Sequence, residues 1–214
     1  MTKRGVYFFE NPGEENTQAV IEVVAMRIEE TDIEAIVVAS ISGKTAIQLA
    51  ECLKGRGLGV KIVCVSGPPS WEKYPEYKFP LIGAERRNRL NGLGVQVVDW
   101  VEEPFRSITF RNWWEKQTLE VEQPKADLFW MTLICVGGHG FRTAIEVIFM
   151  AVEGGAITVG EKVVGVAGTG EGADSVVVMK ASRFEEAVGP DPARRFKVEE
   201  ILAMPKETTW AGYG

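Results

Sequence analysis

The stretch that decides the fold is Ala35-Ile36-Val37-Val38-Ala39-Ser40-Ile41-Ser42-Gly43-Lys44-Thr45-Ala46-Ile47-Gln48-Leu49-Ala50. Its first five residues are apolar and rich in β-branched side chains, which is typical of a buried strand. Small polar residues follow, and an apolar stripe at helical spacing begins directly after them. The pattern predicts a strand over 35–39, a tight loop, and a helix over 45–54.

The loop after this strand has the composition of an anion site. It holds three hydroxyl groups, one glycine and one cation, on Ser40, Ser42, Gly43, Lys44 and Thr45. A helix start offers unpaired N–H groups and a partial positive charge, so we expect a phosphate group to bind here. An ordinary serine N-cap explains the same residues without a ligand. The loop is not a Walker P-loop, because Val38 stands where that pattern needs a glycine.

Composition limits the classes of function. The 214 residues predict a single α/β domain over 1–214. A net charge of −6 disfavours a nucleic-acid partner, and no apolar run of the sequence approaches membrane-spanning length. Three cysteines and a single histidine, His139, match no metal pattern, so no metal is expected. We expect a reduced, cytoplasmic protein in which Cys64 and Cys135 are buried thiols in strands.

Strand and helix patterns alternate along the rest of the chain. Strands are expected over 6–10, 60–65, 95–98, 133–136, 163–167 and 175–179. Helices are expected after a cap at Asn16 or Thr17, with an apolar face from Ala19 to Ile28, over 82–93, and up to Val152. Short links between them predict a mainly parallel, mixed sheet covered on both faces, a three-layer α/β/α sandwich. The closing segment, 196–205, is expected to cover an edge.

Other small-residue loops are expected beside the first one, because ligands of such sheets bind at the carboxyl ends of strands. Ser66 and Gly67 end the strand at 60–65. The segment 137–146 echoes the first loop and predicts a second strand-to-helix turn, although two unrelated turns explain the echo as well. Its candidate residues are Gly138, Arg142 and Thr143.

A glycine-rich loop near the end of the chain is the third candidate. Three glycines in five residues can form a nest of N–H groups around an anion, and they can equally form a hairpin turn. The candidate residues of this loop are Gly168, Thr169, Gly170, Gly172, Ala173 and Asp174.

These motifs carry a family resemblance. The line Ser40-Ile41-Ser42-Gly43-Lys44-Thr45-Ala46 resembles the Thr-x-Ser-Gly-basic-Ser/Thr-Ala motif of the pyruvate kinase C-terminal domain, and 162–179 resembles the last two strands of that domain. The whole chain is similar to small stand-alone archaeal and bacterial proteins of the pyruvate kinase C-terminal (α/β) domain-like family. Those share Phe-x-x-Pro-Gly-x-x-Asn-Thr, matched by 9–17, Ala-Ser-x-x-Gly-x-Thr-Ala, matched by 39–46, and Gly-x-Gly-Ala-Asp, matched by 170–174.

The resemblance implies a ligand rather than a kinase. Pyruvate kinase chemistry belongs to a barrel domain, so kinase activity is not expected, and the domain that this chain resembles binds a phosphorylated effector. Carried over, the phosphate would meet Ser40, Ser42, Gly43, Lys44 and Thr45, with 168–174 closing over it. In the stand-alone family the ligand that the resemblance suggests is flavin mononucleotide (FMN). The chain departs from that family at 138–142, where Gly-x-Lys is more usual, so Arg142 stands in place of that lysine.

Three functions stay open at this point. The first is a binding protein for a small phosphorylated ligand, with Trp71, Tyr74 or Phe141 as a wall for a flavin ring. The second is a flavin-dependent oxidoreductase, in which His139 could carry a proton. The third is a regulatory homo-oligomer that binds a sugar phosphate, suggested by six tryptophans and by the segment 99–130, which has no clear period.

Overall fold

The computed structural model describes residues 5–67, 81–100 and 125–207. They form one mixed sheet whose seven strands lie in the order β1-β7-β6-β5-β2-β3-β4. Strand β6 is antiparallel to both of its neighbours, and the other adjacent pairs are parallel. The strands are β1 (Tyr7–Phe9), β2 (Ala35–Ala39), β3 (Lys61–Val65), β4 (Gln96–Val98), β5 (Lys162–Ala167), β6 (Ser175–Lys180) and β7 (Lys197–Pro205).

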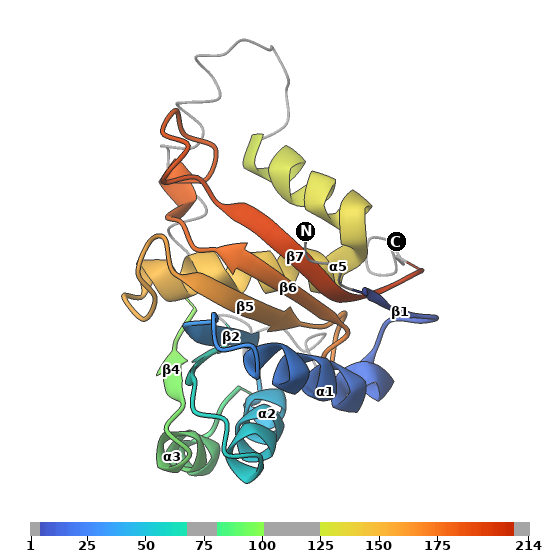
Figure 1. Cartoon of the computed structure of the whole chain (residues 1–214), viewed down its shortest axis with the longest axis vertical. Coiled ribbons are helices and arrows are strands. Elements are labelled where there is room, and N and C mark those ends of the chain that lie inside the picture. Colours follow the sequence, from blue (N-terminus) through green and yellow to red (C-terminus); the bar gives the residue numbers. More distant parts are fainter. Residues whose placement is uncertain (1–4, 68–80, 101–124, 208–214) are drawn as a thin grey trace.

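Helices cover both faces of this sheet, as expected (Figure 1). Alternate residues of each strand point to opposite faces, so one strand serves two cores. In β2, Ile36 and Val38 belong to the core under α1 and α2, whereas Ala35 and Val37 belong to the core under α5. The helices are α1 (Thr17–Ile28), α2 (Lys44–Gly55), α3 (Ala84–Gly92) and α5 (Lys125–Glu153), with short 3-10 turns η1 (Glu14–Asn16) and η3 (Phe184–Glu186). The three-layer α/β/α sandwich is thereby confirmed.

The predicted strand over 133–136 is wrong, because these residues lie in α5. Gly138, with φ 80° and ψ −175°, kinks this helix, and the two halves run in different directions in Figure 1. A short apolar run fits a buried strand and a buried helix equally well, so periodicity could not separate them. The same error misplaced Cys135, which is exposed, whereas Cys64 is buried as predicted.

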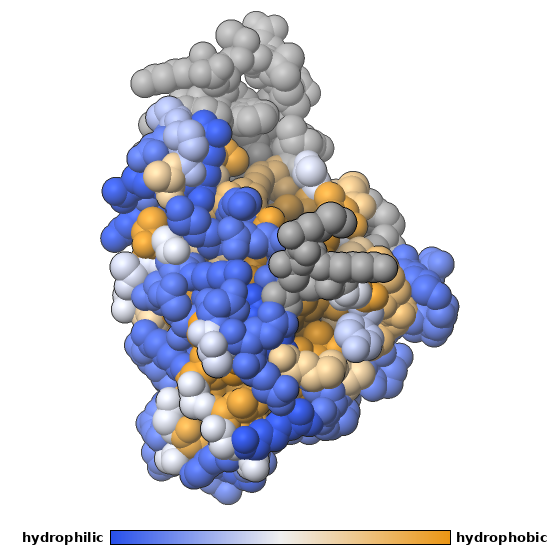
Figure 2. All heavy atoms as spheres, in the orientation of Figure 1, coloured by the Kyte–Doolittle hydropathy of each residue, from blue (hydrophilic) through white to orange (hydrophobic). Residues whose placement is uncertain are grey.

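The closing segment also differs from its expectation. Residues 197–205 form β7, an interior strand between β1 and β6, and β1 occupies the edge instead. Apolar side chains of Val6, Phe8 and Met26 are exposed near this edge, and hydrophobic atoms gather in this region of Figure 2. Whether the protein forms a homo-oligomer stays a prediction.

Helix α5 reaches membrane-spanning length, contrary to the sequence-based expectation. Its stretch Phe129–Glu153 is long and apolar enough by length and composition alone, with a mean hydropathy of 1.4. However, 67% of its most apolar window is buried inside the domain. Side chains such as Ile145, Ile148 and Phe149 pack against the sheet. The apolar character of this helix is thus accounted for by the core of a soluble type of fold.

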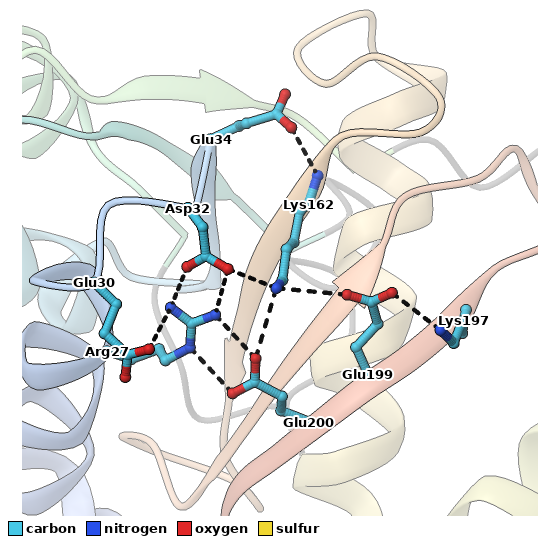
Figure 3. A network of polar contacts seen from close by, with 8 residues as sticks. All are labelled: Arg27, Glu30, Asp32, Glu34, Lys162, Lys197, Glu199 and Glu200. Atoms are coloured by element: carbon cyan, nitrogen blue, oxygen red, sulfur yellow. Dashed lines mark hydrogen bonds and ion pairs between the residues drawn. The ribbon is translucent and has the colours of Figure 1, made fainter. Parts of the chain in front are cut away.

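An ion-pair network around the buried side chain of Arg27 lies at the edge of the sheet where β2 and β5 begin (Figure 3). The side chain of Arg27 is 2% exposed and donates to Asp32 and Glu200. Lys162, the first residue of β5, pairs with the same two carboxylates. The pKa of Asp32 is held well below its usual range by the hydrogen bond from Arg27. This network leaves the opposite edge, where β2, β3 and β5 end, for the site described next.

Candidate functional site

A pocket of about 420 Å³ lies where β2, β3 and β5 end. Three loops and one wall of α5 form it, so segments far apart in the chain meet at this edge. Its lining residues are Glu14, Ala39, Ser40, Ile41, Ser42, Lys44, Thr45, Val65, Ser66, Gly67, Trp100, His139, Arg142, Thr143, Glu146, Val147 and the loop residues 168–172.

The β2–α2 loop forms the first side of the pocket. Gly43 precedes α2 in the left-handed region, at φ 82°, a conformation that favours glycine. The Ala46 N–H donates to Ser40 Oγ at 3.4 Å. The N-cap residue is nevertheless Gly43, which has no side chain to cap the helix, so the ordinary serine N-cap is wrong. The N–H groups of Lys44 and Thr45 make no hydrogen bond to any described residue. Two donors of the first helical turn therefore stay available to a ligand.

An ion pair crosses the mouth of the pocket between Lys44 and Glu14 of η1. The hydrogen bond from Lys44 lowers the pKa of Glu14, and the same contact raises the pKa of Lys44. Both side chains are about half exposed, so water screens this pair. Glu14 was not among the predicted site residues, although it lies inside the Pro-Gly-x-x-Asn-Thr motif.

The glycine loop 168–174 forms the second side, and it is a hairpin between β5 and β6. Gly170 and Gly172 have positive φ values of 85° and 75°. The N–H groups of Gly170, Glu171 and Gly172 have no hydrogen-bond partner within the described part of the chain. Successive free N–H groups of this kind form anion-binding concavities. Both predicted interpretations of the loop, hairpin and nest, thus fit its geometry.

Asp174 and Ala173 hold this loop in place from behind and do not line the pocket. The Asp174 carboxylate is fully buried and accepts hydrogen bonds from the N–H groups of Gly13, at 3.1 Å, and Thr169, at 2.9 Å. Ala173 donates its N–H to Thr17 Oγ1 at 3.0 Å. The two sequence motifs at 9–17 and 170–174 therefore pack against each other, which gives their residues a structural role.

Helix α5 forms the wall behind the loops. The predicted strand-to-helix turn at 137–146 is wrong, since Gly138 is a kink between two helical halves. The kink lies against the start of β6, because a Cβ on Gly140 would collide with Asp174 Oδ1. After the kink, His139, Arg142 and Thr143 face the same pocket as the β2–α2 loop. The segment is at the expected edge, although by a different local structure.

A charged pair lies on this wall. Arg142 Nη2 donates to Glu146 Oε1 at 2.7 Å, and the Arg142 guanidinium lies 5.1 Å from the ring centroid of Trp130. Glu146 is 4% exposed, and burial raises the pKa of its carboxyl to about 7 in spite of the opposing effect of Arg142. Burial likewise lowers the pKa of His139. Glu146 was missed in the sequence, although its i,i+4 spacing from Arg142 was a usable signal.

The end of β3 completes the site. Ser66 is buried and its hydroxyl donates to Asp99 at 3.0 Å, and Asp99 in turn accepts from Arg87 of α3 at 2.7 Å. The hydrogen bond from Arg87 lowers the pKa of Asp99. Ser66 is thus oriented by a partner outside the pocket.

Most of the predicted site residues meet in this pocket, and four do not line it. Gly43 faces α3, where an added Cβ would lie 3.3 Å from Leu90 Cδ1, and Gly138 makes the kink. Ala173 and Asp174 are the other two. Of the predicted aromatic wall, Trp71 and Tyr74 lie outside the described residues, and Phe141 is buried in the core. Trp100 lines the pocket instead.

Comparison with known proteins decides the family. The family model for the pyruvate kinase alpha/beta domain matches residues 18–180. The chain belongs to this family. The match to the pyruvate kinase alpha/beta domain covers the β2–α2 loop, the α5 wall and the glycine loop, and it leaves out β1 and β7. The resemblance to the pyruvate kinase C-terminal domain drawn from the sequence is thereby confirmed.

One solved structure, NAD+ synthetase from Burkholderia pseudomallei, is similar to this protein over 70% of the protein's chain. The sequence identity is 15% and the TM-score 0.35, and the match spans 51% of the synthetase chain.

Within the described residues, no group of three or more His, Cys, Asp and Glu side chains is arranged to hold a metal ion.

Proposed function

We propose that this protein binds a small phosphorylated ligand at the carboxyl edge of its sheet, with FMN as the first candidate, and that it has no pyruvate kinase activity. One observation carries the proposal. Two separate loops with free backbone N–H groups, 44–45 and 170–172, line the same pocket. Helix starts and glycine nests are the two backbone arrangements that bind phosphate most readily.

The charges around the pocket favour a ligand that has an organic part in addition to its anionic group. Lys44 is already paired with Glu14, and Glu171 adds a further carboxylate at the same mouth. Free inorganic phosphate would therefore gain little Coulomb energy in this pocket. Backbone N–H donors and apolar contacts must supply the rest of the affinity.

The apolar part of the pocket supports an organic ligand with a ring. Ile41, Val65, Trp100 and Val147 all line it. Ligand pockets for small molecules span roughly 300–1,000 Å³ and are lined mainly by such side chains. The pocket, at about 420 Å³, lies in this range. A flavin mononucleotide combines a phosphate with a planar ring of this kind.

The test is an absorbance spectrum of the purified protein, followed by titration of FMN fluorescence. The purified protein is expected to show the absorbance bands of oxidised flavin, and the fluorescence of added FMN is expected to be quenched. Riboflavin, which lacks the phosphate, is the matched ligand and should bind much more weakly. A colourless protein that quenches neither ligand contradicts the FMN proposal, and a thermal-shift screen with sugar phosphates then tests the wider one.

One observation favours a second function, a flavin-dependent oxidoreductase. Glu146 lines the pocket with a pKa of about 7, which suits a group that exchanges protons at neutral pH. Anaerobic mixing of the FMN-loaded protein with NADH or NADPH tests this function. Bleaching of the flavin band supports it, and an unchanged spectrum counts against an enzyme that uses those donors.

A further inference from the structure

The wall of the pocket opposite the free N–H groups carries its own hydrogen-bonding pair. Arg142 and Glu146 lie one helical turn apart on α5, and both line the pocket. Their mutual hydrogen bond uses Nη2 of the arginine and Oε1 of the glutamate. In addition to Arg142 Nη1, each side chain keeps one polar atom that this contact does not use.

The unused donor is Arg142 Nε. This atom is buried and has no hydrogen-bond partner among the residues that the structure describes. A buried N–H without a partner is costly, by about 1–3 kcal/mol, so such an atom is seldom left unpaired in a finished site. A ligand oxygen would satisfy it.

The unused acceptor is Glu146 Oε2. The residue is 4% exposed, and its described contacts involve only Arg142. A carboxylate can accept several hydrogen bonds, and no described residue donates a hydrogen bond to Glu146 Oε2. A ligand N–H would fill that position.

We propose that Arg142 and Glu146 together recognise a heterocycle that presents a ring N–H next to a carbonyl group. The arginine donates to the carbonyl oxygen, and the glutamate accepts from the ring N–H. The isoalloxazine ring of FMN has such an edge at N3, between two carbonyl groups, and uracil has the same edge. The inference rests on the proposed function, since the phosphate loops would hold the other end of the same ligand.

Recognition of a ring N–H requires an ionised Glu146, and this gives the site a pH dependence. Burial keeps the pKa of Glu146 near 7. The charged or titratable groups that share the pocket are His139 and Arg142 on α5, Lys44 on α2, and Glu14 and Glu171 at the mouth. Binding of an N–H donor therefore strengthens as the pH rises through about 7.

The experiment compares FMN with FMN methylated at N3, which lacks the ring N–H. We expect the methylated ligand to bind the wild-type protein about tenfold more weakly or worse at pH 8, and the difference to shrink at pH 6. Glu146→Gln should remove this pH dependence of the discrimination. Glu153→Gln, the same change two turns further along α5 and outside the pocket, should leave it intact. Far-UV circular dichroism establishes that each variant is folded.

The outcomes separate this inference from the proposed function. If both flavins bind wild type within twofold of each other at pH 8, the Arg142–Glu146 pair does not recognise the ring edge, although the phosphate site stands. If Glu146→Gln keeps the wild-type pH profile, the inference fails as well. If FMN does not bind, UMP against CMP tests the same edge, because CMP lacks that ring N–H. Failure of all four ligands overturns this inference and the FMN proposal, and the sugar-phosphate screen then tests the wider proposed function.

Discussion

The carboxylate of Asp174 accepts a hydrogen bond from the backbone N–H of Gly13, 161 residues earlier in the chain. The same carboxylate oxygen accepts the N–H of Thr169 at 2.9 Å. One buried side chain thus ties the segment before α1 to the glycine loop of the pocket. The two segments also interlock sterically, because a Cβ on Gly172 would collide with Thr17 Oγ1. The shape of the site depends on this junction.

Asp174→Ala should therefore destabilise the protein by about 2 kcal/mol or more, because two N–H groups lose their acceptor. Urea denaturation measures the change. The control is Asp191→Ala, which removes an exposed hydrogen bond to the Ala193 N–H and should change little. Equal stability of the two variants would mean that Asp174 does not hold the junction together.

Lys44→Ala should weaken binding of FMN about tenfold, since the charged donor at the helix start is lost. Glu14→Gln should act in the opposite direction, because it releases Lys44 from its ion pair and removes a negative charge from the mouth. Isothermal titration calorimetry measures the FMN affinity of both variants. Lys54→Ala, in the last turn of the same helix, is the control. Unchanged affinity in Lys44→Ala would place the phosphate elsewhere.

The free energy of unfolding should depend on pH between about 4.5 and 7 because of Glu146. The folded pKa is raised to about 7 from 4.5, so the folded state holds this proton more tightly than the unfolded chain does. The stabilisation from this group is full below pH 4.5 and is lost as the pH rises through 7, by about 3 kcal/mol. In Glu146→Gln this contribution disappears, so the difference in unfolding free energy between the two proteins should vary with pH. A constant difference would contradict the buried, raised pKa.

Gly165→Ala should destabilise the protein by about 1–3 kcal/mol through overpacking. Helix α5 lies so close to β5 that an added Cβ would collide with the Ala144 carbonyl oxygen and reach Ile148. Gly59→Ala is the matched control, because an added Cβ there meets no atom within 4 Å. Thermal unfolding of both variants gives the comparison. A decrease in unfolding temperature no larger than that of the control would show that α5 can move away from the sheet at little cost in free energy.

Arg27→Leu should cost about 3 kcal/mol of stability, because Glu200 keeps a largely buried charge without its main partner. None of the residues of the network (Figure 3) lines the pocket, so FMN affinity should not change. Arg56→Leu breaks an exposed pair with Glu22 and should have little effect on stability. A loss of FMN binding in folded Arg27→Leu would link the two edges.

Much of the architecture followed from local patterns in the sequence. The run from Ala35 to Ala50 identified β2, its loop and α2, because a β-branched apolar strand and an apolar stripe at helical spacing are both local signals. The rule that strand ends of a parallel sheet share one edge then brought Ser40, Ser66 and Thr169 into one pocket. These predictions needed no long-range contact.

Only the tertiary structure decided the features that depend on contacts between distant segments. The run at 133–136 lies in helix α5, directly before the kink at Gly138, and nothing local in its sequence distinguishes it from a strand. Residues 197–205 became an interior strand because β1 pairs outside them. Asp174 lies behind the pocket and not in it, because its carboxylate accepts the N–H of Gly13 there. The sequence by itself determined most of the elements and the edge at which the site lies, since these follow from periodicity and chain direction. The residues that face the ligand were decided by packing.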